Sequence, residues 1–444
     1  MGADFAMIFT ANRRNILSNL GWSVGGKLIT IAGSLLVGLI IARYLGPERW
    51  GLLNYIISFV FLYQTFAVFG LDYIEVREMA RCPEACDTIM GTAFVIRLVF
   101  ALLAMMAVAI TAWTTESDPY VALMLCIYAF TIICSTLNVV RNYFMAKVQN
   151  KYVAQSEILR TLIGMALKLL LFFLGVGLTG FILASIFDTV LLASGYLAAY
   201  HRKVGSLRSW CFDAGWCRLL LRESFPLMLT SAAVMVYQRI DQVMIGRMID
   251  KEAVGYFSTA GRFVEALIYI PMMLSQTISP VLTRLRGQDE TLYRKRAQFF
   301  MNASVWLSLV LAAVLSALSY WIIYILLGKQ YLPSVPVLQI MAFKAASVAL
   351  SNTAGTMIVV EGLQRYAIVR DLFGCIVCVV LNYLFLPQYG IIAAAVVAIA
   401  SNIAAGWFAD LFVPSYRHLF VMQTKALFLG WRSFFNLREL RGAA

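Results

Sequence analysis

The sequence predicts an all-α polytopic membrane protein. Of its 444 residues, 61% are apolar and only 13% are charged. Apolar runs recur along the chain, and about twenty residues at 1.5 Å per residue cross the hydrocarbon core of a bilayer. These runs predict twelve transmembrane helices, at residues 20–41, 52–69, 91–112, 120–140, 157–175, 180–200, 224–245, 254–281, 300–326, 335–360, 366–386 and 391–412.

Lys and Arg are divided unevenly between the loops. Because these residues accumulate on the cytoplasmic side of a membrane, the bias predicts that both termini are cytoplasmic. The net charge of +13 then belongs to loops that lie against anionic headgroups, and nucleic acid is not expected as a partner. With this orientation the inner segments carry 24 Lys and Arg residues and the outer loops five, namely Arg43, Arg49, Arg247, Lys251 and Lys329.

Two parts of the chain resemble each other. At a shift of 204 residues, residues 40–59 align with residues 244–263, which matches Arg43 to Arg247 and Gly51 to Gly255. Both copies have the same predicted sidedness, which is typical of parallel halves related by an axis along the membrane normal. We therefore expect two six-helix lobes at 1–200 and 224–413, a cytoplasmic linker at 201–223 and a cytoplasmic amphipathic tail at 414–444.

Charged side chains inside the predicted spans indicate a polar pathway, because a charge at bilayer depth costs at least about 2.5–3.5 kcal/mol. Cations outnumber acids there, which favours an anionic substrate. We predict four principal substrate-binding cations, Lys27, Arg239, Arg262 and Lys344, and two secondary ones, Arg97 and Lys168, while Asn54, Tyr237 and Gln238 could line a sugar path. The alternative is structural: Arg262 and Glu265 are spaced i, i+3 and could neutralise each other, and the polar residues could simply satisfy helix contacts.

Three acids within the spans, Asp188, Asp241 and Glu265, are candidates for coupling to H⁺ or Na⁺. Asp241 cannot pair with Arg239 on its own helix, and Asp188 has no close cation in sequence, so both are better candidates than Glu265. The alternative is that they pair across helices with Lys168 or Lys344. The sequence contains no Gly-x-x-x-x-Gly-Lys-Ser/Thr segment, so this chain is not expected to use ATP directly.

Three segments carry a family resemblance. Residues 42–52 (ARYLGPERWGL) resemble the ARxLGPxxFG signature that follows the first span of Wzx-type O-antigen flippases, which are bacterial polysaccharide transporters, although Trp50 stands where Phe is usual. Residues 70–81 resemble the segment after that family's second span, and residues 241–246 (DQVMIG) resemble the end of its seventh span. The resemblance covers nearly the whole chain and implies the MATE-like fold of a larger exporter superfamily.

The resemblance also implies a function. It suggests a non-enzymatic flippase that moves undecaprenyl-diphosphate-linked oligosaccharide across the bacterial inner membrane, and it makes other polysaccharide assembly proteins candidate partners. A MATE-type multidrug or cation antiporter is the alternative, but its cavity should be acidic rather than cationic. An intramembrane glycosyltransferase would need a larger outer loop than residues 113–119 or 328–333 provide. No cofactor or metal is expected, and the eight scattered cysteines are predicted to be free thiols.

Overall fold

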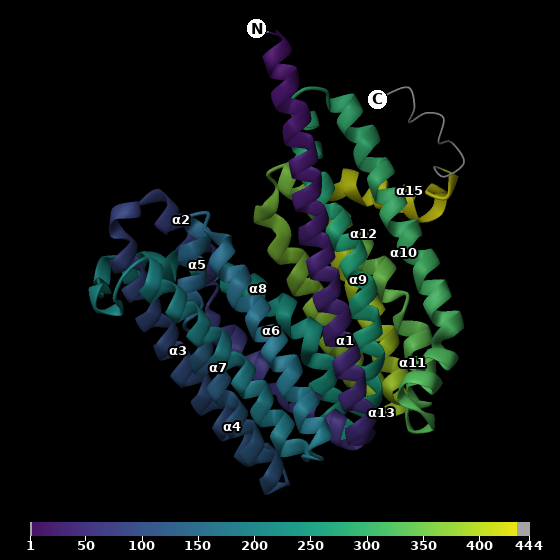
Figure 1. Ribbon diagram of the computed structural model, residues 1–444. Coiled ribbons are helices and arrows are strands. Elements are labelled where there is room, and N and C mark those ends of the chain that lie inside the picture. The colour runs from purple at the N-terminus through teal and green to yellow at the C-terminus, as the bar shows by residue number, and fades with distance from the viewer. Residues whose placement is uncertain (1, 433–444) are drawn as a thin grey trace.

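The computed structural model describes the backbone of residues 2–432 and the side chains of residues 33–364 and 366–432. Within these residues all regular elements are helical (Figure 1), which confirms the predicted fold class. Nine helical segments among the described residues are long and apolar enough to cross a membrane. Many large apolar side chains, such as Leu103, Ile110, Val310 and Ile325, are exposed, as expected of surfaces that face lipid.

The helices form two groups (Figure 1). One comprises α2 (Leu71–Arg81), α3 (Cys86–Thr115), α4 (Pro119–Ser135), α5 (Asn138–Ala146), α6 (Asn150–Phe173) and α7 (Leu178–Lys203). The other comprises α9 (Lys251–Arg286), α10 (Glu290–Leu327), α11 (Ser334–Met341), α12 (Lys344–Val360), α13 (Ala367–Ile403), α14 (Ala409–Phe412) and α15 (Arg417–Leu429). We call these the amino-terminal group and the carboxy-terminal group. Two helices, α1 (Gly2–Val68) and α8 (Ala214–Met248), contact both groups.

Helix α1 contains two antiparallel segments. Gly46 has φ 77°, a backbone conformation that favours glycine, and Pro47 follows it, so the chain reverses there. The first segment ends beside the end of α6, where the rings of Tyr44 and Phe172 lie 5.3 Å apart. The second runs back along α3, where the Tyr63 hydroxyl donates a 3.0 Å hydrogen bond to Thr111 Oγ1.

Helix α13 is divided in the same way, because Pro387 lies inside it and Gly390 has φ 60°. With α1 and α13 each counted as two segments, and with α6 added to the nine candidates, the described helices are compatible with the twelve predicted spans. Two of these spans are interrupted, one between α4 and α5 and the other between α11 and α12. They are the fourth and tenth spans, which occupy corresponding positions in the two halves.

The two repeats face each other in the structure. Gly51 lies against the carbonyl of Lys251, and Gly255 lies against the carbonyl of Pro47. Because Pro47 corresponds to Lys251 and Gly51 to Gly255, the two contacts are reciprocal, as at an interface with two-fold symmetry. The structure therefore supports the prediction of two parallel halves. The boundaries predicted at 200 and 224 stay predictions, since the first turns of α8 pack against α2 and α3 of the amino-terminal group.

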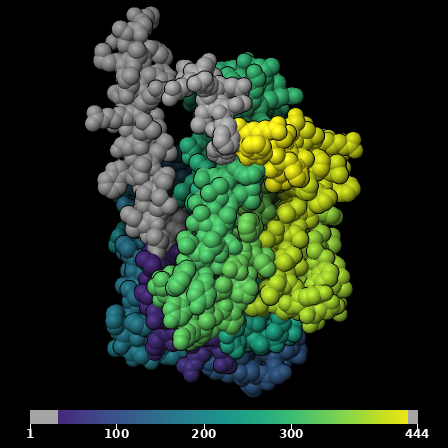
Figure 2. Space-filling model, turned by 90° about the vertical axis from the view of Figure 1, so that its right-hand side faces the viewer, coloured from purple at the N-terminus to yellow at the C-terminus, as the bar shows by residue number. Residues whose placement is uncertain are grey.

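Helix α15 follows the last span and lies across the carboxy-terminal group rather than along it (Figure 1). In the space-filling view of Figure 2 the yellow residues near the carboxyl end lie beside the green surface of the preceding helices. Gln423 anchors α15 by donating a hydrogen bond to the Gly406 carbonyl in a π-helical turn, Ala404–Phe408. The predicted tail at 414–444 thus begins with a docked helix, and residues 433–444 lie outside the described part.

Candidate functional site

Two of the predicted cations lie where the second segment of α1 meets α8 and α9. The guanidinium of Arg262 on α9 lies over the Trp50 ring, 4.4 Å from its centroid. The guanidinium of Arg239 on α8 lies 6.0 Å from the centroid of Phe61. The packing that brings them there comes from α1, whose Ser58 donates a 2.7 Å hydrogen bond to Gln242 Oε1. We call this junction of α1, α8 and α9 the arginine junction.

The charges at the arginine junction do not pair as the helical spacing suggested. Glu265 forms a 3.5 Å ion pair with Arg239, and not with Arg262 three residues before it on the same helix. The side chains of Arg239 and Glu265 are 34% and 56% exposed, so this pair is accessible to solvent. Arg262 forms no ion pair with any side chain that the structure describes. The junction therefore holds two cations and one acid.

In the described part of the chain, Asn54, Tyr237 and Gln238 form no hydrogen bond with Arg239 or Arg262. Asn54 is buried and donates a 2.8 Å hydrogen bond to the Trp50 carbonyl of its own helix. The Tyr237 carbonyl accepts a contact from the Cys378 thiol of α13, and Gln238 is exposed. The side chain of Lys27 lies outside the described residues.

Arg97 lies elsewhere, in a buried network that holds α2 against α3. Its guanidinium contacts Glu75 Oε1 at 2.7 Å and Asp72 Oδ1 at 2.6 Å, and only 1% of its side chain is exposed. Asn142 of α5 donates hydrogen bonds to the same two carboxylates. Arg97 is therefore neutralised, and the structure does not bring it to the arginine junction. Glu75 lies beyond the second predicted span, residues 52–69, so sequence analysis did not count it among the charges inside the spans.

Lys168 and Asp188 pair with each other between α6 and α7. Of the two readings that the sequence left open for Asp188, the structure shows the cross-helix pair with Lys168. This pair is a neutral unit within the amino-terminal group. Tyr128 lies within electrostatic range of both Asp188 and Arg239.

Asp241 is the only one of the three predicted coupling acids that is fully buried, with 2% exposure. Its Oδ1 accepts a 2.6 Å hydrogen bond from Asn382 Nδ2 and a 3.3 Å one from the Cys378 thiol, both on α13. The Oδ1 of Asn382 has no hydrogen-bond partner among the described residues. Lys344, at the first residue of α12 where the tenth span is interrupted, lies within electrostatic range of Asp241. We call these four residues the Asp241 cluster.

A second buried charge pair in the carboxy-terminal group was not predicted. Arg370 of α13 lies 3.1 Å from Asp410 Oδ1, and the two side chains are 8% and 0% exposed. The guanidinium also donates to the Ala405 and Gly406 carbonyls of the π-helical turn. Sequence analysis counted Arg370 among the loop cations, although it and Asp410 have opposite charges and both fall inside predicted spans.

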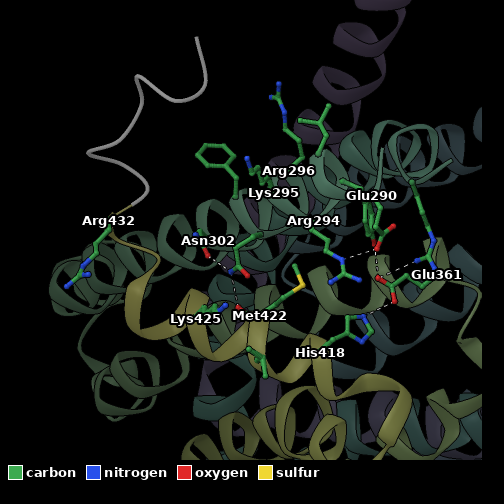
Figure 3. Close-up of a pocket in the computed structure, with 16 residues that line it drawn as sticks. Glu290, Arg294, Lys295, Arg296, Asn302, Glu361, His418, Met422, Lys425 and Arg432 are labelled. Atoms are coloured by element: carbon green, nitrogen blue, oxygen red, sulfur yellow. Dashed lines mark hydrogen bonds and ion pairs between the residues drawn. The ribbon is translucent and has the colours of Figure 1, made fainter. Parts of the chain in front are cut away.

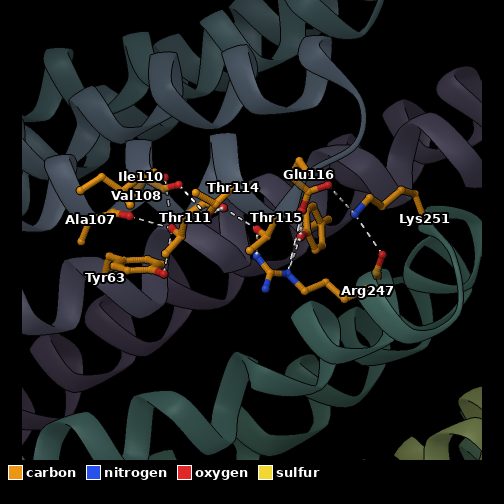
Figure 4. A network of polar contacts seen from close by, with 12 residues as sticks. Tyr63, Ala107, Val108, Ile110, Thr111, Thr114, Thr115, Glu116, Arg247 and Lys251 are labelled. Carbon is orange, nitrogen blue, oxygen red and sulfur yellow. Dashed lines mark hydrogen bonds and ion pairs between the residues drawn. The ribbon is translucent and has the colours of Figure 1, made fainter.

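The two halves are linked by a polar network at one end of the molecule, shown in Figure 4. Glu116, in the loop after α3, contacts Lys251 at 3.5 Å and Arg247 at 4.0 Å and accepts a hydrogen bond from Tyr55. Arg247 also donates a 2.6 Å hydrogen bond to Thr115. Sequence reasoning had treated Arg247 and Lys251 only as loop charges. We call this set the outer network, after the side that the loop charges predict.

The outer network has a counterpart across the pseudo-symmetry axis. Arg43, the repeat equivalent of Arg247, reaches the Leu326 carbonyl at the end of α10. Tyr331 donates a 2.7 Å hydrogen bond to the Ala42 carbonyl. Both halves therefore use equivalent loops to hold this end closed.

No cluster of His, Cys, Asp and Glu side chains in the described part of the chain is suited to a metal ion. All eight cysteines are free. The candidate site comprises three parts: the arginine junction with two cations and one acid, the Asp241 cluster with one buried acid, and the outer network that joins the halves at one end.

A family model described as "Polysaccharide biosynthesis protein" matches residues 16–286 of this chain. A second model, MatE, matches residues 226–384. The chain is also similar to the succinoglycan biosynthesis transport protein ExoT of Rhizobium meliloti (strain 1021). The two are 26% identical over 343 residues, which cover 75% of this chain and 67% of the relative.

Solved structures show the same fold. The structure of the lipid II flippase MurJ in an inward closed conformation superposes with a TM-score of 0.69 at 13% identity, and the match covers 92% of this chain and 91% of that one. A multidrug resistance MATE family transporter of the MOP superfamily, in an inward-facing conformation, gives a TM-score of 0.66 at 16% identity. That match covers 88% of this chain and 96% of the other.

Proposed function

The chain belongs to the polysaccharide biosynthesis protein family, and from this premise we propose that it is a flippase for undecaprenyl-diphosphate-linked oligosaccharides. The unit that it moves is an O-antigen or similar surface polysaccharide repeat. Transport runs from the cytoplasmic to the periplasmic leaflet of the bacterial inner membrane by alternating access. Both termini are then cytoplasmic, as the loop charges predict.

The observation that carries this proposal is the excess of positive charge at the arginine junction. Arg239 and Arg262 approach α1 from two helices, and only Glu265 opposes them. A diphosphate needs cationic donors, and guanidinium groups match the geometry of phosphate oxygens. The polyprenyl tail can stay in the bilayer while the diphosphate and glycan use this polar junction.

Alternating access requires contacts that can break. The outer network joins the halves through ion pairs of Glu116 with Lys251 at 3.5 Å and with Arg247 at 4.0 Å, and the two cationic side chains are 22% and 37% exposed. Binding of H⁺ or Na⁺ at the Asp241 cluster would favour one arrangement of the halves and the anionic lipid the other. Each ligand can shift the equilibrium only by its differential affinity for the two arrangements.

The proposal is tested in cells that lack the chain. They should accumulate a lipid-linked oligosaccharide on the cytoplasmic side, and the parent chain should restore its export. Arg262→Gln should export about tenfold more slowly at unchanged abundance, because a hydrogen bond to a charged group contributes about 1.5–3 kcal/mol. The export rate of Arg262→Lys should lie between that of the parent and that of Arg262→Gln.

The matched control is Arg222→Gln, which removes the same charge from an exposed position of α8 without a described partner. Normal export by Arg262→Gln, or equal loss in Arg222→Gln, would contradict the proposed role of the junction. For Lys27 the sequence predicts that Lys27→Arg exports better than Lys27→Glu, because only the second inverts the local field.

The match to MatE keeps the multidrug or cation antiporter as a second candidate. If the chain is an antiporter for cationic drugs, cells that lack it should become sensitive to such drugs. Their export of the lipid-linked oligosaccharide should stay normal. The two functions are therefore separated by one strain and two readouts.

A further inference from the structure

A basic groove lies at the end of the molecule opposite the outer network, between the start of α10, the end of α9 and the crossing helix α15 (Figure 3). It is open to solvent and measures about 1220 Å³. Six cations and two acids line it: Arg286, Arg294, Lys295, Arg296, Lys425 and Arg432 against Glu290 and Glu361. The arginine junction and the Asp241 cluster share no residue with this groove.

The two acids of the groove are already neutralised. Glu361 contacts His418 at 2.8 Å and Arg286 at 3.4 Å, and it accepts a 3.0 Å hydrogen bond from Tyr293. Glu290 pairs with Arg294 on the next turn of α10 at 2.9 Å. Lys295 and Lys425 form no ion pair with any described acid. The lining of the groove therefore keeps a net positive charge, although Asp289 at the start of α10 lies within electrostatic range of Lys295.

Apolar side chains lie beside these cations on α15 and just after it. Phe428 is 68% exposed, Val421 49% and Trp431 43%. A helix that exposes bulky apolar residues next to Lys425 and Arg432 is typical of one that lies in the headgroup region of a membrane. This observation is independent of the charge count, and it distinguishes a lipid from a soluble anion.

The length of α10 also places the groove in the headgroup region of the membrane. With 38 residues, α10 is about 57 Å long, whereas the hydrocarbon core is about 30 Å thick. The first turns of α10, which carry Arg294 and Lys295, therefore extend beyond the core into the headgroup region. Helix α15 crosses α10 next to these turns, where Gln298 Nε2 donates a 2.9 Å hydrogen bond to the Met422 carbonyl, and Trp306 farther along α10 donates a 2.9 Å hydrogen bond to the Ala426 carbonyl.

We propose that this groove binds the phosphate of an anionic phospholipid and that the bound headgroup holds α15 against α10. Lys295 and Lys425 reach the phosphate from the two helices, while Phe428 and Trp431 contact the acyl chains. The leaflet is the one that the loop charges assign to the cytoplasm. The site is separate from the transported substrate, so it stands whether or not the proposed transport function is correct.

The test uses the purified full chain in neutral detergent and measures thermal unfolding and lipid retention by native mass spectrometry. Phosphatidylglycerol should stabilise the chain and be retained, and phosphatidylcholine with the same acyl chains should not. Each basic residue near an anionic surface contributes a factor of about five in affinity. The variant Lys295→Gln/Lys425→Gln should therefore bind phosphatidylglycerol on the order of 25-fold more weakly.

The control variant Arg218→Gln/Arg222→Gln removes the same charge from exposed positions of α8 at the same end. It should bind phosphatidylglycerol like the parent, and both variants should unfold like the parent without lipid. Equal weakening in the control would mean unspecific attraction and would overturn the site. Stabilisation by inorganic phosphate alone would make it a simple anion site. Stabilisation by soluble polyglutamate but not by phosphatidylglycerol would assign it to an acidic protein segment; either result would overturn the lipid proposal.

Discussion

Gly51 and Gly255 are equivalent residues of the two repeats, and they meet across the axis that relates the halves. A methyl group on Gly51 would lie 2.6 Å from the Gly255 nitrogen, and one on Gly255 would lie 2.8 Å from the Pro47 carbonyl carbon. Both distances are too short for real side chains, and the obstructing atoms belong to rigid backbone. The closed outer face therefore depends on glycine at both positions.

This contact predicts that Gly51→Ala and Gly255→Ala disfavour the closed outer face, since overpacking costs about 1–3 kcal/mol. A cysteine at Asn54, which is 7% exposed in the closed structure, should then react faster with an impermeant thiol reagent in a cysteine-free background. Gly355→Ala is the control, because a methyl group there meets no atom within 4 Å. Unchanged labelling in both glycine variants would show that this contact does not limit opening.

Glu116 is the centre of the outer network, so Glu116→Gln should also favour opening of this face. The ion pairs to Lys251 and Arg247 are lost, and the exchange Glu116→Lys/Lys251→Glu should restore part of the closure. Glu48→Gln, which changes an exposed carboxylate of the same face, should have no effect. Spin-label distances across the face measure the shift, and equal distances in parent and Glu116→Gln would contradict the prediction.

Asp241 and Asp188 should behave differently. Asp241 has no ion-pair partner among the described residues, whereas Asp188 is paired with Lys168. In sealed vesicles Asp241→Asn should transport without responding to an imposed H⁺ or Na⁺ gradient. Asp188→Asn should keep the response but be less stable by about 1–3 kcal/mol, because Lys168 loses its partner. An intact gradient response in Asp241→Asn would exclude it as the coupling site.

The carboxylate of Glu361 links four helix ends and predicts a pH effect outside the spans. Burial works to raise the pKa of Glu361, but His418, Tyr293 and Arg286 outweigh it and hold the pKa below the usual value of 4.5. The folded state thus releases this proton more readily than the unfolded state. The resulting stabilisation is present above pH 4.5 and is lost as the pH falls through the lower, folded-state pKa.

Thermal unfolding should therefore show Glu361→Gln to be less stable than the parent at pH 7, with a difference that shrinks below pH 4.5. Glu290→Gln, which alters an exposed pair on one helix, should show little difference at either pH. A constant difference between parent and Glu361→Gln from pH 7 to pH 3 would contradict this role.

The proposed orientation is tested by single cysteines in whole cells. Cys211 is exposed at the end that carries most loop cations, and Ser117 is exposed at the opposite end. An impermeant thiol reagent added outside should label Ser117→Cys and leave Cys211 unlabelled until the cells are opened. The reverse pattern would invert the topology.

Sequence analysis could predict the class of the protein, the approximate positions of its spans and its internal repeat, because each of these features depends on a short stretch of sequence. An apolar run long enough to cross a bilayer is visible in any window of about twenty residues. The match of Gly51 to Gly255 is a comparison of two short segments. The structure confirmed the helical class and showed that these two glycines meet.

The pairing of charges could not be predicted in the same way, because it depends on which helices pack together. The i, i+3 spacing along α9 made a pair between Arg262 and Glu265 possible. In the structure α8 packs beside α9, so Glu265 pairs with Arg239, and Arg262 lies over the Trp50 ring. Arg97 was predicted to bind substrate, but the packing of α2 against α3 pairs it with Glu75.

The sequence by itself thus determined that this chain is a helical membrane protein and that its predicted spans carry more positive than negative charge. Only the tertiary structure decided which of these charges are neutralised. Partners such as Arg370 and Asp410 are forty residues apart in sequence and meet at 3.1 Å. The cost of burying a charge must be offset by a partner charge or by hydrogen bonds, and long-range helix packing determines which groups are available.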